Sequence, residues 1–133
     1  IEGEAISKSY VNPEKTTIDE PLKTILRRAQ KVILVLADTH VGERTAVCVP
    51  EFTDALGTTY KFQMTKCNER LFKYWKHLAL MCRKYFKPDE IWIVGDLVAG
   101  HTSKVFEKTR KLTIEDLDRQ KQAFIALIRQ LIP

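Results

Sequence analysis

The sequence of 133 residues is poor in the features that mark several classes of protein. Five glycines and five prolines are too few for a collagen-like or low-complexity chain, and an apolar content of 44% excludes a mainly disordered one. No apolar run approaches the roughly 20 residues that a membrane-spanning helix needs. The first residues, Ile1-Glu2-Gly3-Glu4, are too polar for a secretory signal. We therefore expect a globular, cytoplasmic protein without a membrane partner.

The three cysteines are an odd number and include no C-x-x-C pair. This argues against a disulfide framework and against a zinc knuckle, and it fits the reducing cytoplasm. Cys67 and Cys82 share the apolar stripe of a helical pattern, so we expect both thiols to be buried.

The formal net charge of +5 is unevenly distributed. Residues 61–90 contain eight lysines and arginines against three acidic residues, whereas residues 31–60 carry an excess of acid. A basic half permits an anionic partner such as a phosphate ester or a nucleic acid. The alternative is that these charges only cover the solvated side of a helix.

Hydrophobic periodicity divides the chain into an irregular arm over residues 1–18 and one α/β domain over residues 19–133. Apolar runs predict strands, and apolar residues that recur at steps of three and four predict helices. The predicted helices cover residues 20–30, 65–86 and 114–131, the predicted strands cover residues 32–37 and 90–95, and a long loop covers residues 38–62. Asp19 and Thr113 are the expected N-caps of the first and last helices.

The two predicted strands are continuous apolar runs, which is typical of strands buried on both faces of a parallel sheet. A strand, a long helix and a second strand form a βαβ unit, so we expect the strands to be parallel. Asp38 and His40 follow the first strand, and Asp96 follows the second. Because ligands bind outside the carboxyl ends of such strands, these side chains are expected to converge if the chain turns, for which Gly42 is available. Two carboxylates and an imidazole suit Mn²⁺, Fe²⁺ or Zn²⁺.

The first strand ends in a segment that resembles the D-x-H-x-G motif of the calcineurin-like metallophosphoesterases, Leu36-Ala37-Asp38-Thr39-His40-Val41-Gly42. Residues 93–98 are similar to the second motif of that family, a hydrophobic strand that ends in Gly-Asp. Residues 42–60 and the helix that carries Trp75 are most similar to its phage and provirus branch. The resemblance covers about residues 31–132.

This resemblance implies a two-metal phosphoesterase, a hydrolase with a parallel βαβ core inside an αββα sandwich. Asp38 and His40 would bind the first ion, and Asp96 would bridge both ions, with Mn²⁺ the first choice of metal. A metal-activated water would then attack a phosphomonoester or a phosphodiester. The segment Asp-Thr-His-Val-Gly is also similar to the double-strand-break repair nucleases of this superfamily. This second resemblance favours nucleic acid as the substrate.

Three further residues are weighed for the site. His101 lies five residues beyond Asp96 and is a candidate catalytic residue near the substrate or its leaving group, the alternative being an ordinary loop histidine. Arg44 follows Gly42 and is a candidate ligand of the substrate phosphate, the alternative being a solvated arginine. His77 lies within the long predicted helix, and we interpret it as structural.

The sequence also departs from the family. A G-N-H motif and two later histidines complete the family's metal site, and this chain has neither that motif nor that pair. We therefore expect roughly the N-terminal half of such a domain, in which three ligands cannot saturate two ions. Three explanations stay open: the chain is a fragment, a second chain or a second copy completes the site, or catalysis has been lost. The last favours a non-catalytic binding or assembly module, and a basic nucleic-acid-binding domain without chemistry is a third candidate function.

Overall fold

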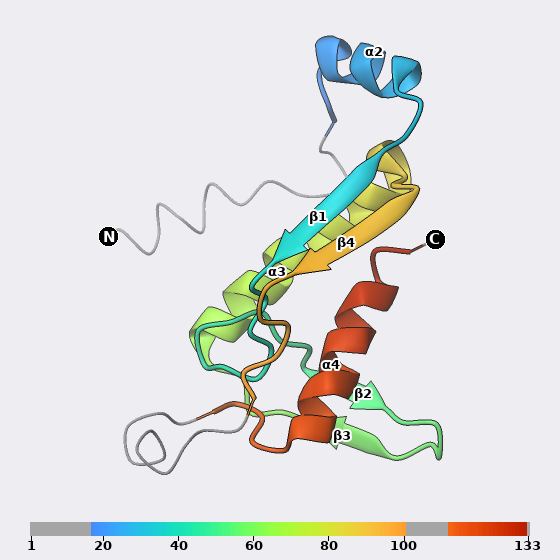
Figure 1. The fold of residues 1–133 in the computed structure, drawn as a ribbon. Helices are drawn as coiled ribbons and strands as arrows, with labels where there is room; N and C mark the ends of the chain where they lie inside the picture. The colour runs from blue at the N-terminus through green and yellow to red at the C-terminus, as the bar shows by residue number, and fades with distance from the viewer. Residues whose placement is uncertain (1–16, 101–111, 133) are drawn as a thin grey trace, which may run out of the picture.

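The computed structural model describes residues 17–100 and 112–132, which form a mixed α/β structure (Figure 1). In chain order the elements are α2 (Glu20–Arg28), β1 (Ile33–Ala37), β2 (Glu51–Thr53), β3 (Thr59–Lys61), α3 (Lys66–Met81), the π-helical turn η2 (Cys82–Phe86), β4 (Glu90–Val94) and α4 (Leu117–Arg129). Most of the arm predicted over residues 1–18 lies outside the described ranges, and Ile18 near its end is buried. No helix within the described ranges is long and apolar enough to cross a membrane.

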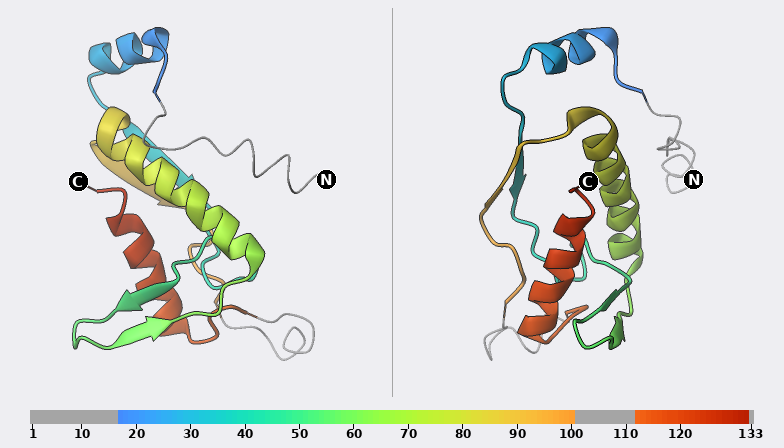
Figure 2. Two further views of the ribbon diagram at one scale, coloured as in Figure 1. Left: turned by 180° about the vertical axis from the view of Figure 1, so that it is seen from behind. Right: turned by 90° about the vertical axis from the view of Figure 1, so that its right-hand side faces the viewer.

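The strands β1 and β4 pair in parallel, as the βαβ pattern predicts. Val35 lies opposite Trp92, and Ala37 lies opposite Val94. Helix α3 connects the two halves of this unit and runs back along one side of the sheet (Figure 2). Because a crossover helix runs antiparallel to the strands it joins, α3 begins at the end of the sheet where both strands finish.

The prediction that both strands are buried on both faces is wrong for the described residues. Leu36 is buried and Leu34 packs against the core, whereas alternate residues on the opposite face of the sheet are exposed. The exposed apolar side chains are Ile33, Val35, Trp92 and Val94. Within the described ranges α3 covers one side of the sheet, and an apolar run cannot tell what covers the second side.

A β-hairpin lies inside the loop predicted over residues 38–62. Strands β2 and β3 pair antiparallel around a tight turn, where Asp54 Oδ1 accepts hydrogen bonds from the backbone N–H groups of Leu56 (2.9 Å) and Thr58 (2.8 Å). The rings of Phe52 and Tyr60 lie 5.1 Å apart across the two strands. Strands of three residues are too short to show an alternating pattern, so periodicity missed both.

Side-chain caps set the starts of the first and last described helices. Asp19 Oδ1 accepts a hydrogen bond from the backbone N–H of Leu22 at 2.9 Å, and this confirms the predicted cap of α2. In α4 the cap is Asp116, whose Oδ1 accepts from the backbone N–H of Arg119 at 2.8 Å. The prediction of Thr113 as this cap is therefore wrong, because two residues of capping type stand three positions apart and only tertiary contacts choose between them.

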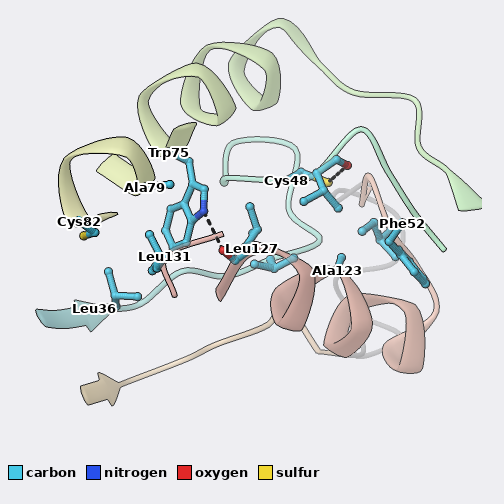
Figure 3. Close-up of a cluster of buried hydrophobic side chains, with 12 residues drawn as sticks. Leu36, Cys48, Phe52, Trp75, Ala79, Cys82, Ala123, Leu127 and Leu131 are labelled. Atoms are coloured by element: carbon cyan, nitrogen blue, oxygen red, sulfur yellow. Dashed lines mark hydrogen bonds between the residues drawn. The ribbon is translucent and has the colours of Figure 1, made fainter. Parts of the chain in front are cut away.

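The core lies between α3, α4 and the covered side of the parallel sheet (Figure 3). Trp75 of α3 is buried beside Leu127 of α4, and its indole N–H donates to the Leu127 carbonyl at 3.1 Å. Cys48 is also buried, and burial raises the pKa of its thiol to about 11. Cys82 is buried as predicted, whereas Cys67 is exposed, so its predicted burial is wrong.

Candidate metal centre

The segments that follow β1 and β4 stay side by side beyond the ends of the strands. The backbone N–H of Asp38 donates to the carbonyl of Val94, and that of His40 donates to the carbonyl of Asp96, each at 3.1 Å. Asp38 Oδ1 in turn accepts a hydrogen bond from the backbone N–H of Asp96 at 3.1 Å. The structure therefore brings the three residues singled out as ligands to one place at the carboxyl ends of the strands.

An unusual backbone turn sets the course of the chain after β1. Asp38 and His40 have φ angles of 48° and 45°, and Gly42 continues the turn at 113°. For residues other than glycine this left-handed region costs on the order of 1 kcal/mol each, and it is common at functional sites. The chain therefore turns at Asp38 and His40 themselves, earlier than the turn that we expected at Gly42.

Gly95 makes room for the carboxylate of Asp38. A Cβ atom at position 95 would lie 2.1 Å from Asp38 Oδ1, and the φ angle of Gly95 is 76°. Glycine suits this position because of its positive φ angle, and because an added side chain would displace the Asp38 carboxylate from its hydrogen bond with Asp96.

Replacing Gly95 with alanine is expected to lower the free energy of unfolding by about 2 kcal/mol, since the clash with Asp38 adds to the cost of the positive φ angle. Urea unfolding measures this loss. Gly57→Ala is the matched control, because Gly57 has a φ angle of 84° but open space around the added Cβ. It should cost about 1 kcal/mol. Equal losses in the two variants would contradict the close approach of Asp38 to Gly95.

Glu43 lies beside the imidazole of His40 and could not be singled out from the sequence. His40 Nδ1 lies 3.4 Å from Glu43 Oε1, and the Glu43 side chain is mostly buried, with 15% of its area exposed. A carboxylate beside Nδ1 favours the tautomer that carries its proton there, and Nε2 then keeps a lone pair for a metal ion. The spacing of three residues between His40 and Glu43 was the available signal.

Side chains of Asp38, His40 and Asp96 are not gathered into a coordination sphere. Residues 17–100 and 112–132 contain no group of three or more His, Cys, Asp or Glu side chains arranged to hold a metal ion. Hydrogen bonds therefore bring the backbone segments of the three residues together, and the Asp38 carboxylate accepts one of these hydrogen bonds from Asp96. Both carboxylates are exposed to solvent.

Arg44, the candidate phosphate ligand, lies at a separate hollow of about 440 Å³ at the start of α3. Lys66 adds a second positive charge to this hollow, and Thr65 and Thr113 line it with hydroxyl groups. Within the described ranges neither Arg44 nor Lys66 forms an ion pair. His101, the candidate catalytic residue, lies outside the described residues.

A buried glutamine of α4 holds both segments of the site in position. Gln120 is fully buried, accepts a hydrogen bond from the backbone N–H of Gly100 at 2.8 Å, and donates to the carbonyl of Ile114 at 2.8 Å. A Cβ atom at Gly42 would lie 2.9 Å from the Gln120 side chain, so the two residues are in close contact. Gln120 could not be singled out from the sequence, because a polar residue on an amphipathic helix ordinarily faces water.

The candidate metal centre thus brings two exposed carboxylates and one imidazole to neighbouring segments, with Glu43 beside the imidazole and Gln120 supporting the adjoining backbone. No family model matches this sequence, and no curated protein or solved structure shows a significant match to it.

Proposed function

We propose that the chain is a metal-dependent phosphoesterase of the calcineurin-like type, in which Asp38, His40 and Asp96 are metal ligands. The observation that carries the proposal is the meeting of Asp38 with Asp96 at the carboxyl ends of two paired parallel strands. The segments that meet there are residues 36–42 and 93–98, the two that resemble the family's motifs. An αββα sandwich with this βαβ unit in its core is part of the same proposal.

The donor atoms suit a single divalent cation. Carboxylate oxygens and an imidazole nitrogen are ligands for Mn²⁺, Fe²⁺ and Zn²⁺, and Mn²⁺ is our first choice. The exposure of Asp38 and Asp96 leaves room for an ion and its water. Three residues provide too few ligands for two ions, so a second ion requires ligands from another segment or from a second chain.

Each residue has a distinct part in this proposal. When bound, the ion would polarise a phosphoryl oxygen and lower the pKa of a bound water. Asp38, His40 and Asp96 would hold it, and Glu43 would keep the Nε2 lone pair of His40 available. Arg44 would attract an anionic ester from the start of α3, at the same end of the sheet.

Phosphodiesters in nucleic acid are the substrate class that we favour. The helix α3 and its flanks carry most of the chain's excess positive charge, since residues 61–90 contain eight basic residues against three acidic ones. A polyanion with several phosphates makes better use of an extended basic surface than a monoester does.

Hydrolysis of bis(p-nitrophenyl) phosphate in the presence of Mn²⁺ tests the proposed activity. We expect turnover that EDTA abolishes and that falls at least about a hundredfold in Asp38→Ala. Glu43→Gln should weaken Mn²⁺ binding about tenfold, because the imidazole loses the carboxylate that orients it. Asp118→Ala is the matched control, since this carboxylate of α4 is 85% exposed and is not one of the proposed ligands. Its rate should equal that of the unmodified chain.

Titration of Mn²⁺ by calorimetry separates the outcomes if the chain shows no turnover. Binding that disappears in Asp96→Asn would support the ion site and contradict catalysis by this chain alone. An absence of binding would overturn the proposal. It would favour the alternative function, a non-catalytic binding or assembly module. The observation that supports this alternative is that the described residues contain no group of three side chains arranged to hold a metal ion.

A further inference from the structure

The solvent side of α3 carries charge of nearly one sign. The helix contains four basic residues and one acidic residue, Glu69, and all five side chains are exposed. Lys66, Arg70 and Lys73 recur at steps of four and three, so they lie on one side of the helix. Trp75, which is buried in the core, lies on the opposite side. The first two turns of α3 therefore present a row of positive charge away from the core.

Arg44 extends this row at the start of the helix. Arg44 and Lys66 line the same hollow of about 440 Å³. Thr65, the N-cap of α3, donates from its Oγ1 to the carbonyl of Arg44 at 2.5 Å, which holds the backbone of Arg44 beside the helix. We call the four residues Arg44, Lys66, Arg70 and Lys73 the basic track.

The basic track begins next to the candidate metal centre. Asn68 of α3 donates from Nδ2 to the carbonyl of Glu43 at 2.9 Å, and Glu43 lies beside the His40 imidazole. Direct hydrogen bonds therefore hold the start of α3 against the segment that follows His40. From Lys66 to Lys73 the track runs about 10 Å along the helix axis. A chain of phosphates bound along the track would lead to the candidate centre.

Two charges of the basic track are available to an external anion. Lys66 and Arg70 form no ion pair within the described ranges, although the exposed carboxylate of Glu69 stands between them in the sequence. By contrast, Lys23 of α2 and Lys121 of α4 are each paired with a carboxylate of their own helix. An arginine can donate two hydrogen bonds to one phosphate, and a lysine attracts phosphate as a point charge. The track therefore suits a polyanion that carries phosphates.

We propose that the basic track binds the phosphate backbone of nucleic acid and holds it beside the candidate metal centre. The choice of nucleic acid among polyanions rests on the proposed function, since the proposed phosphodiesterase centre lies at the end of the track. Contacts to phosphates position a duplex without reading its bases, so binding should be independent of sequence. With four such contacts on a DNA duplex, the logarithm of the binding constant should fall with the logarithm of the salt concentration at a slope of about −3.6.

Fluorescence anisotropy with a labelled DNA duplex tests the track in EDTA, where the proposed hydrolysis cannot occur. We expect Lys66→Ala and Arg70→Ala each to weaken binding about fivefold or more and to make the salt slope shallower by about one, on duplexes of unrelated sequence. Arg28→Ala is the matched control, because it removes the same charge from an exposed side chain of α2, beyond the start of β1 (Figure 1). This variant should keep the affinity and slope of the unmodified chain. Circular dichroism checks that all three variants keep the fold.

An absence of duplex binding would overturn the basic track. So would an equal loss of affinity in Arg28→Ala, because binding would then follow only the net charge of the chain. Two combined results separate this inference from the proposed activity. Turnover with Mn²⁺ but no duplex binding in EDTA would support the phosphoesterase and overturn the track. Duplex binding with the expected slopes but no binding of Mn²⁺ would support the track and overturn the metal-dependent activity, in favour of a nucleic-acid-binding domain without chemistry.

Discussion

Replacing Trp75 with alanine is expected to lower the free energy of unfolding by about 4 kcal/mol. Trp75 is the largest side chain between α3 and α4, and its removal would leave a cavity beside Leu127 and Leu131 (Figure 3). The change also removes the hydrogen bond from the indole N–H to the Leu127 carbonyl, at 3.1 Å. A domain of this size has roughly 5–15 kcal/mol of stability in total, so the variant should unfold at a clearly lower urea concentration than the unmodified chain.

Urea unfolding followed by circular dichroism measures the effect of Trp75→Ala, and two further variants explain it. Trp75→Phe keeps most of the volume and loses the hydrogen bond, so it should cost about 2 kcal/mol. Tyr74→Ala, the adjacent and 47% exposed aromatic residue of α3, should cost about 1 kcal/mol or less. A loss for Trp75→Ala no greater than that for Tyr74→Ala would contradict the placement of Trp75 in the core.

Replacing Asn68 with alanine is expected to cost about 3 kcal/mol, although the residue is polar. Asn68 is fully buried, and its Nδ2 donates to the carbonyls of Glu43 (2.9 Å) and Ala46 (2.6 Å). Its Oδ1 accepts from the backbone N–H of Thr65 at 3.0 Å and from Thr113 Oγ1 at 2.8 Å. Alanine would leave several of these groups buried without a partner, at about 1 kcal/mol or more for each.

The Asn68 variant also tests how the candidate metal centre is supported. Because Asn68 holds the carbonyl of Glu43, its loss should loosen the segment that follows His40, and backbone amides of residues 43–46 should exchange with solvent faster than in the unmodified chain. Gln122→Ala, an exposed change on α4, is the control and should alter stability by at most about 0.5 kcal/mol. Unchanged stability and exchange in Asn68→Ala would show that the hydrogen bonds of this residue are dispensable.

Several local features were predictable because they depend on residues close together in the sequence. The cap at Asp19, the helical period that begins near Met64 and the apolar runs before Asp38 and Gly95 each arise within one or two turns of chain. The βαβ pattern also predicted the parallel pairing of β1 with β4. The α/β class, the parallel pair and the location of the candidate ligands at the ends of two strands were therefore available without a structure.

Other features were decided by tertiary contacts between distant segments. The choice of Asp116 over Thr113 as the cap of α4, the hairpin in residues 51–61 and the exposure of Cys67 could not be predicted from local pattern. Which face of the parallel sheet is covered depends on where α3 crosses, and an apolar run reads the same whether one side or both sides are buried. The roles of the buried polar residues also could not be predicted from the sequence.

The sequence by itself determined the secondary structure of the main elements and the chemical types of the candidate ligands. Only the tertiary structure decided that Asp38 and His40 turn the chain with positive φ angles, and that Glu43 and Gln120 support the site. The physical reason is that hydrophobic period and capping are short-range properties of a chain, whereas buried hydrogen bonds depend on groups that folding brings together from far apart.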